Sequence, residues 1–285
     1  MSGRQHRFRR PRRIPAAPAA ARLVVVSALL ACAPPSGAPR ALASAWNRAA
    51  AEGFVSLDAA TSGGSAFFDG AGRLEPARPY AKSEAAAYVE YGVTDKLMFV
   101  ARPSFDLVSL GAPAGGTYRG LGATEIGAQY QALVFGPAVL AVLGSATLPG
   151  TTSRANPASI GNTARAFEAR GLAGLSLALG PFPAFIETQQ AFRLRTAGAA
   201  PQWQADAALG FRPVPRLLIM ALGALVVPTG PRTAWFPSGR TAGVGLRAVL
   251  DLTTAVSISL TATTTLAGRD ALRDRSLALG LWYRF

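Results

Sequence analysis

Apolar residues alternate with small or polar residues in short segments along the chain from about residue 84 to its end. In the last of these, 276–285, Phe285 and Tyr283 fall on one side while Arg284 and Gly280 fall on the other. Successive residues of a strand point to opposite faces, so this pattern is typical of strands with one apolar face. No uninterrupted run of about 18 apolar residues occurs outside the N-terminal region, which argues against a helical membrane span. The pattern predicts an all-β domain.

The connections between these segments are of two kinds that alternate along the chain. Short ones, rich in Gly, Pro and Asp, lie near 92–96, 135–137, 180–183, 212–216 and 251–254. Longer, mostly polar ones lie at 61–80, 109–117, 148–164 and 228–239, with shorter examples near 198–201 and 268–271. Bacterial outer-membrane barrels combine short periplasmic turns with longer extracellular loops. We therefore expect a transmembrane antiparallel β-barrel of about 12 strands, with both of its ends on the periplasmic side.

Segment 217–227 (LLIMALGALVV) departs from the alternation because it is apolar on both faces. A strand that is buried on both sides reads in this way. We expect this segment to face a plug or a dry part of the inner wall.

Residues 1–45 have the composition of a secretory signal peptide, which leaves 46–285 for the barrel. An Arg-rich start precedes the apolar run LVVVSALLACA and then APRALASAW, which contains small-residue cleavage sites. The sequence favours cleavage after Ala45, with Ala43 as the alternative, and export by the general secretory route.

Two other interpretations of the leader are weaker. Arg9-Arg10 is not followed by the residues expected after a twin-arginine pair, and a lipid-linked Cys32 would leave a Pro-rich tether before the barrel. Cys32 is the only Cys and His6 the only His. The mature chain would therefore lack the residues for a Ser-His-Asp or Cys-His nucleophile, a thiolate or imidazole zinc site, or a disulfide. We expect no enzyme activity, metal or cofactor.

The formal charge of +14 belongs mainly to the leader, whose eight Arg residues have no acidic counterpart. The remainder has 21 basic and 15 acidic residues, with no basic run after residue 45. This distribution argues against a nucleic-acid partner.

Alternation places a set of charged residues on the predicted inner face. Because an Arg at the middle of a bilayer costs roughly 2–4 kcal/mol, these side chains should face a lumen. They either form an ion-paired filling that holds a narrow barrel together or, in the case of the arginines, line a path that selects solutes. A single bulge would shift their phase. The lumen-lining candidates are Glu84, Glu90, Arg102, Asp106, Arg119, Glu125, Glu168, Arg170, Glu187, Arg193, Arg195, Asp206, Arg247 and Asp274.

Two chemical interpretations of the acidic residues are weaker. Glu84 and Glu90 are two carboxylates of one strand, but that spacing is poor support for a glycosidase pair. Asp69 and Glu75 in the first long connection fall short of the three or more oxygens that a cation needs.

The leader ending ALASAW and the terminal LALGLWYRF, with Tyr283 and the final Phe285 as an assembly signal, resemble Gram-negative outer-membrane β-barrel proteins. The start AWNRAAAEGFVSLDAATS, FFDGAGR and the hairpin EYGVTDKL resemble transporters related to the phenol meta-pathway outer-membrane family. The resemblance implies outer-membrane localisation, contact with lipid and lipopolysaccharide, and insertion by the barrel-assembly machinery through the C-terminal strand. It also implies passage of small, in some cases hydrophobic, solutes.

We expect a porin-like channel or passive transporter with a narrow charged lumen, gated by the connections 61–80 and 148–164. The alternative is a non-conducting barrel with a structural or surface role in the envelope or in polysaccharide export.

Overall fold

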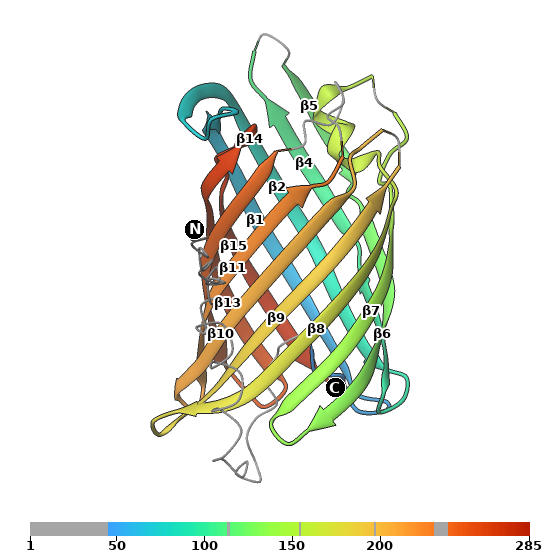
Figure 1. Ribbon diagram of the computed structural model, residues 1–285, viewed down its shortest axis with the longest axis vertical. Helices are drawn as coiled ribbons and strands as arrows, with labels where there is room; N and C mark the ends of the chain where they lie inside the picture. The colour runs from blue at the N-terminus through green and yellow to red at the C-terminus, as the bar shows by residue number, and fades with distance from the viewer. Residues whose placement is uncertain (1–44, 113–114, 154, 197, 231–238) are drawn as a thin grey trace, which may run out of the picture. The chain divides into compact units, whose positions relative to one another are not determined.

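The alternating segments form long, tilted antiparallel strands that close into a barrel (Figure 1). The computed structural model describes residues 45–112, 115–153, 155–196, 198–230 and 239–285. The leader 1–44 and its predicted cleavage sites lie outside the described residues, apart from Ala45.

The strands follow the chain in order, with one short 3-10 helix between β7 and β8. They are β1 (Gly53–Phe68), β2 (Leu74–Gly92), β3 (Leu97–Arg102), β4 (Ser104–Leu110), β5 (Gly116–Leu121), β6 (Thr124–Phe135), β7 (Ala138–Leu148), η2 (Pro157–Asn162), β8 (Ala166–Leu179), β9 (Phe182–Arg195), β10 (Gln202–Val214), β11 (Leu217–Pro228), β12 (Arg240–Asp251), β13 (Val256–Arg269), β14 (Ala271–Leu272) and β15 (Arg275–Arg284).

Three strands of the barrel wall are interrupted. Pro103 separates β3 from β4 because proline has no N–H to donate, although its carbonyl accepts from the Ala87 amide at 3.1 Å. Gly122 and Ala123 separate β5 from β6, and two residues separate β14 from β15. With each interrupted strand counted once, the described residues form the expected 12-stranded barrel.

The first and last strands close the barrel. β1 pairs with β2 on one side and with β15 on the other, so that Phe54 lies opposite both Glu90 and Arg284. The aromatic end of the chain takes part, since Phe285 donates its N–H to the carbonyl of Gly53 at 3.0 Å. Closure leaves no open sheet edge, which a structure surrounded by lipid requires.

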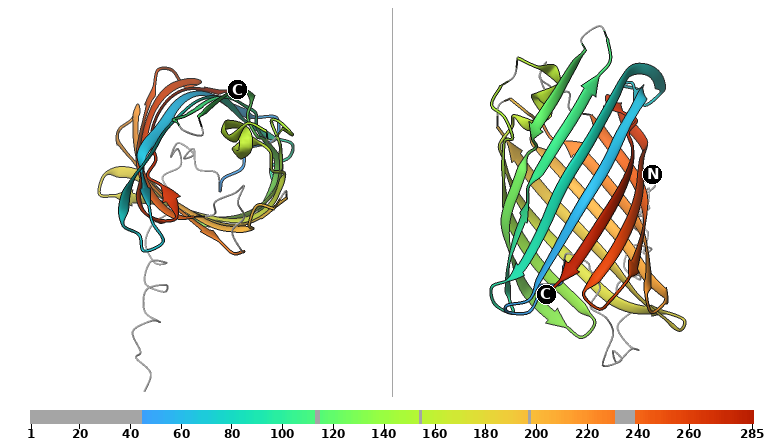
Figure 2. Two further views of the ribbon diagram at one scale, coloured as in Figure 1. Left: turned by 90° about the horizontal axis from the view of Figure 1, so that it is seen from above. Right: turned by 180° about the vertical axis from the view of Figure 1, so that it is seen from behind.

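All the short connections lie at one end, here called the turn end, together with Phe285 and the described start of the chain (Figures 1 and 2). Gly136 and Gly180 have φ of 54° and 61°, and each precedes a proline. Positive φ at the first central residue suits a two-residue hairpin turn of type II′, and proline fixes the second. The opposite end is called the loop end.

At the loop end the structure corrects one expectation. Connection 61–80 is not a long loop, because β1 continues to Phe68 and β2 begins at Leu74. The two strands form a hairpin whose turn is closed by Asp69, which accepts the backbone N–H groups of Ala71 and Arg73 at 2.8 Å each. These hydrogen bonds and the Arg73 guanidinium lower the pKa of Asp69, with the Arg73 backbone N–H as the largest cause. The hairpin is therefore a stiff extension of the wall.

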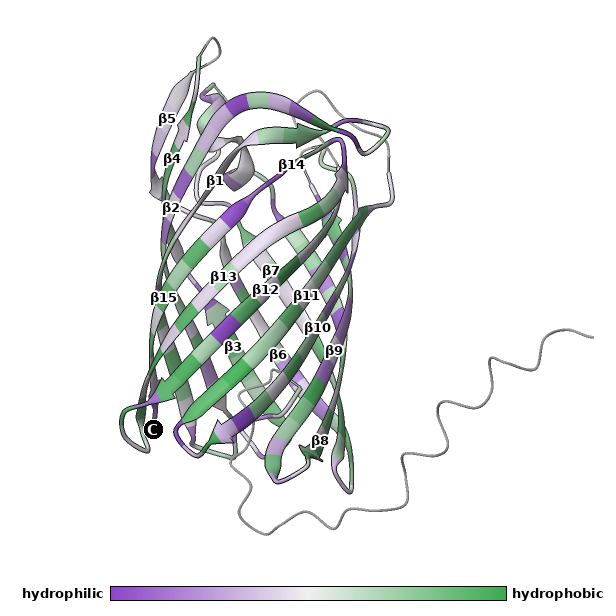
Figure 3. Cartoon of the chain, turned by 90° about the vertical axis from the view of Figure 1, so that its left-hand side faces the viewer, coloured by the Kyte–Doolittle hydropathy of each residue, from purple (hydrophilic) through white to green (hydrophobic). Residues whose placement is uncertain are grey.

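The faces of the strands are as the alternation predicts. Leu246 and Leu279 are 64% and 63% exposed on the outside, whereas Glu90 and Asp106 are 4% and 1% exposed on the inside. In Figure 3, β11 is green along most of its length, in keeping with its apolar residues on both faces. The wall thus separates an apolar exterior from a polar interior.

Candidate functional site: the lumen

Residues 45–52 run into the barrel at the turn end instead of continuing β1 (Figure 2). The backbone N–H of Asn47 donates to Oε1 of Gln131 at 3.1 Å, and Nε2 of Gln129 donates to the side-chain oxygen Oδ1 of Asn47 at 3.0 Å. Ala45 is fully buried against Val139 and its neighbours on the inner wall. The segment therefore occupies the lumen.

An ion pair fixes this segment to β2. The Arg48 guanidinium lies 2.7 Å from the Glu90 carboxylate, and their side chains are only 15% and 6% exposed. Tyr88 donates its hydroxyl to the other oxygen of Glu90 at 3.0 Å, and the Arg48 guanidinium carbon lies 4.9 Å from the centre of the Phe54 ring. In a poorly hydrated setting such a pair holds well only when its remaining hydrogen-bonding positions are occupied, as they are here.

A hydrophobic cluster lies on the inner face of the barrel beside this segment. It consists of Phe54, Phe185, Leu218, Met220, Val249 and Trp282, with Trp46, Tyr88, Ala208 and Leu222 packed against it. The expectation of a dry wall at 217–227 agrees with the first half of β11, where Leu218 and Met220 are buried in this cluster and Leu222 packs against it, whereas Gly223 and Ala224 line a cavity. We refer to the cluster and segment 45–52 together as the plug.

Trp46 reaches its place because the wall has no side chain there. A Cβ at Gly174 would lie 2.4 Å from the Trp46 ring, closer than any real contact. The Trp46 ring in turn meets Phe185 edge-on, with centroids 6.2 Å apart. Gly174 thus provides the space in which the N-terminal segment joins the cluster.

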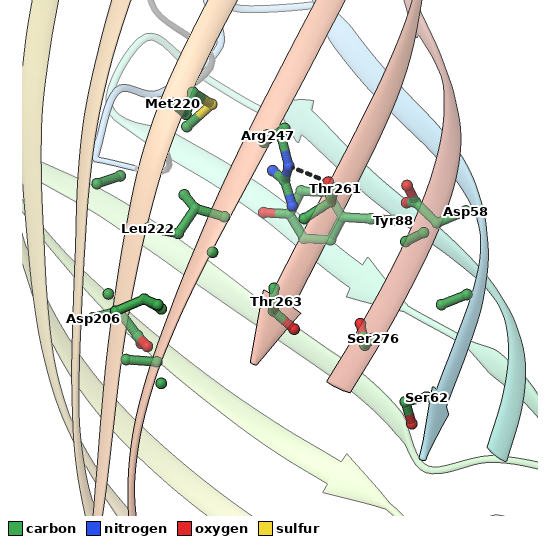
Figure 4. Close-up of a pocket in the computed structure, with 18 of the residues that line it drawn as sticks. Asp58, Ser62, Tyr88, Asp206, Met220, Leu222, Arg247, Thr261, Thr263 and Ser276 are labelled. Carbon is green, nitrogen blue, oxygen red and sulfur yellow. Dashed lines mark hydrogen bonds between the residues drawn. The ribbon is translucent and has the colours of Figure 1, made fainter. Parts of the chain in front are cut away.

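Above the plug lies a cavity of about 780 Å³ (Figure 4). Its floor includes Phe54, Tyr88, Met220, Leu222 and Trp282 of the plug. Apart from Arg247, Asp274 and the floor residues, the wall from β11 to β15 is mostly small or hydroxylic, whereas β2, β9 and β10 contribute most of the charge. A volume of this size suits a small organic molecule.

Of the predicted lumen candidates, seven line this cavity. They are Glu84, Glu90, Arg102, Glu187, Asp206, Arg247 and Asp274.

Most of the others lie on the same inner face in charge networks. Glu168 is central to one, with Arg170 and Arg193 each at 2.7 Å, and Arg170 also lies 3.0 Å from Asp206. Arg195 has the phase of Arg193 and lies opposite the buried Ala166. These residues form a charged wall along β8, β9 and β10.

A second network lies nearer the loop end. Lys82 contacts Glu84 at 2.7 Å and Asp106 at 3.1 Å, and Arg102 lies 2.8 Å from Glu84. Asn162 of η2 donates to Asp106 at 2.8 Å, which joins the connection 148–164 to the inner wall. Viewed from above, η2 lies within the ring of strands (Figure 2).

Glu125, the remaining acidic candidate, accepts a hydrogen bond from Ser145 at 2.7 Å.

Arg119 differs from the other candidates, because its predicted inward position was wrong. It lies opposite Leu107, which is 46% exposed on the outside, whereas Asp106 faces inward. The irregularity at Gly122 and Ala123 shifts the phase, because Glu125 six residues later is inward.

The sequence interpretation missed several lumen residues. Lys82 and Asp58 have the same phase as Glu84 and Ser56, so alternation alone would have found them. Arg48 and Asn47 had no such signal, because they precede the first strand.

Among the described residues, no helix has the length and hydropathy to cross a membrane, and no three His, Cys, Asp or Glu side chains are grouped to hold a metal ion.

Solved structures share this architecture at low sequence identity. An outer membrane channel from Pseudomonas putida F1 matches with a TM-score of 0.70 and 13% identity, over 85% of this chain and 98% of that one. The translocator domain of the autotransporter NalP from Neisseria meningitidis matches with a TM-score of 0.52 and 11% identity, over 82% of this chain and 88% of that one. The NanC porin matches with a TM-score of 0.50 and 8% identity, over 80% of this chain and 98% of that one. These matches establish the fold.

No protein-family model matches the sequence, and neither does any curated protein. The resemblance to the phenol meta-pathway family therefore stays a prediction.

Proposed function

We propose that the protein is an outer-membrane channel or passive transporter for small solutes. The observation that carries the proposal is a polar cavity inside a closed barrel whose lumen, at the turn end, holds a segment that is not a strand. The wall strands are held by continuous ladders, whereas residues 45–50 are held mainly by side-chain contacts, and backbone hydrogen bonds to Gly92 begin only at Ala51 and Glu52. Movement of that segment would open the lumen without breaking the wall.

The apolar exterior supports a place in the membrane, and the barrel class supports the Gram-negative outer membrane with lipopolysaccharide outside. In this orientation the turn end faces the periplasm. The rings of Tyr283 and Phe285 stack at the end of the chain with their centroids 5.8 Å apart, and both side chains are exposed. Their exposure on the last strand supports a role in recognition by the barrel-assembly machinery.

The fold neighbour from Pseudomonas putida is itself described as a channel, and NanC as a porin.

The competing function is a non-conducting structural or surface barrel, and the plug is the observation that favours it. Swelling of proteoliposomes in solutions of small sugars and amino acids separates the two. Swelling that exceeds protein-free liposomes and falls with solute size supports a channel. Wild-type protein and plug variants that both leave liposomes unswollen would support the structural role.

A further inference from the structure

Arg247 occupies a special position in the cavity. It points inward from β12, between Met220 of β11 and Thr261 of β13 in the strand register (Figure 4). Its Nε donates to the Thr261 hydroxyl at 2.8 Å, and its guanidinium carbon lies 5.8 Å from the centre of the Trp282 ring. The guanidinium therefore lies at the floor of the cavity, directly above the plug.

Arg247 differs from the other cavity cations in having no ion pair. Lys82 and Arg102 are each bound to Glu84, and Arg170 behind them to Glu168 and Asp206. No carboxylate lies within 4.0 Å of Arg247 among the described residues, which include all 15 acidic residues of the chain. The two terminal NH2 groups of its guanidinium thus have no hydrogen-bond acceptor among the described residues.

Asp58 is a candidate counter-charge because it lines the same cavity as Arg247, but it does not make contact. It accepts the Ser56 hydroxyl at 2.5 Å and remains beyond ion-pair distance of Arg247. The guanidinium is therefore attracted to Asp58 without being saturated by it.

The surroundings of Arg247 are apolar on the plug side. Met220 and Trp282 are 4% and 5% exposed, and Tyr88 and Leu222 complete the floor. A guanidinium fork binds a carboxylate with two parallel hydrogen bonds, and an adjacent apolar floor buries a hydrocarbon or ring. One polar anchor beside apolar walls is the usual arrangement of a small-molecule site.

We propose that Arg247 anchors a binding site for a small organic carboxylate, whose apolar part lies on Trp282 and Met220. The inference deepens the proposed channel function by naming the class of solute that the lumen binds. A binding site directly above the plug would hold the solute next to the segment whose movement would open the lumen.

Calorimetric titration of the purified, detergent-solubilised protein tests the site without requiring conduction. The probes are benzoate, benzyl alcohol and benzylamine, which share a ring and differ in charge. Benzoate should bind, benzyl alcohol about tenfold more weakly, and benzylamine more weakly still. Equal binding of the three would overturn the proposal.

Variants assign the effect to Arg247. Arg247→Gln should weaken benzoate binding about tenfold or more, and Asp58→Asn should strengthen it. Arg73→Gln removes an equal charge from the hairpin turn, where Arg73 is paired with Asp69 outside the cavity, so it should change binding by less than about twofold. A gel shift between boiled and unboiled samples establishes that each variant is folded. A folded Arg247→Gln barrel with unchanged benzoate affinity would refute the site.

The outcome is separable from that of the channel proposal. Benzoate binding at Arg247 in a protein that never conducts would retain the site and reject the channel. Conduction without selective benzoate binding would retain the channel and reject the binding site.

Discussion

The Arg48 guanidinium and the Glu90 carboxylate lie 2.7 Å apart inside the barrel, and this contact joins a segment outside the sheet to the wall. Arg48 precedes the first strand, whereas Glu90 lies near the end of the second. The pair therefore holds the N-terminal segment against the inner wall of the barrel.

Replacing the acidic partner should loosen the plug. Glu90→Gln keeps the size of the side chain but leaves Arg48 without its carboxylate, which in a buried pair costs about 3 kcal/mol. We expect a lower unfolding midpoint in urea and more frequent openings in planar bilayers. Glu75→Gln, at an exposed site on the hairpin, is the control and should behave as wild type.

The space at Gly174 should be equally important. Gly174→Leu places a side chain where the Trp46 ring lies, so the N-terminal segment should be expelled and conductance should rise. Gly171→Leu is the matched control, since Gly171 lies three residues earlier on the same strand, opposite the outward Val142, with nothing within 4 Å. Equal conductance of the two variants would show that Trp46 does not restrict the lumen.

The exterior should tolerate charge only near its ends. Leu279→Arg adds a guanidinium to the apolar band between Ala59 and Leu260, at an expected cost of about 2–4 kcal/mol. Leu74→Arg, beside the loop-end turn, should cost much less. Urea-dependent folding into liposomes measures both, and equal costs would argue against a lipid-facing wall.

The hairpin turn at Asp69 should respond to acid. Its folded-state pKa is lowered, so the carboxylate stabilises the turn fully above the unfolded pKa of about 3.9 and loses that effect as the pH falls through the folded value. In an NMR titration, the amide signals of Ala71 and Arg73 should shift with a midpoint below the unfolded value. Asp69→Asn should abolish that titration, and a midpoint above about 4 would contradict the hydrogen-bonded turn.

The barrel and the faces of its strands could be predicted because alternation has a period of two and lipid penalises charge on one side. Glu84, Arg170 and Asp206 were placed correctly from that rule alone. Arg119 was not, because alternation carries no mark of the irregularity at Gly122 and Ala123.

Only one of the two components of the plug could be predicted from the sequence. The doubly apolar 217–227 indicated a dry wall, but nothing in the sequence located its partner in residues 45–52. Arg48, Asn47 and Trp46 act through contacts with residues far along the chain, and such contacts leave no periodic signal. The same holds for the unpaired state of Arg247, which depends on where every carboxylate lies.

Single-channel recording of the barrel with residues 46–52 deleted, beside the full-length mature protein, tests the central claim most directly. If the lumen is a solute path closed by the plug, the deletion should give larger and longer current steps than the full-length barrel. Folded, membrane-inserted protein that passes no current in either form would contradict it.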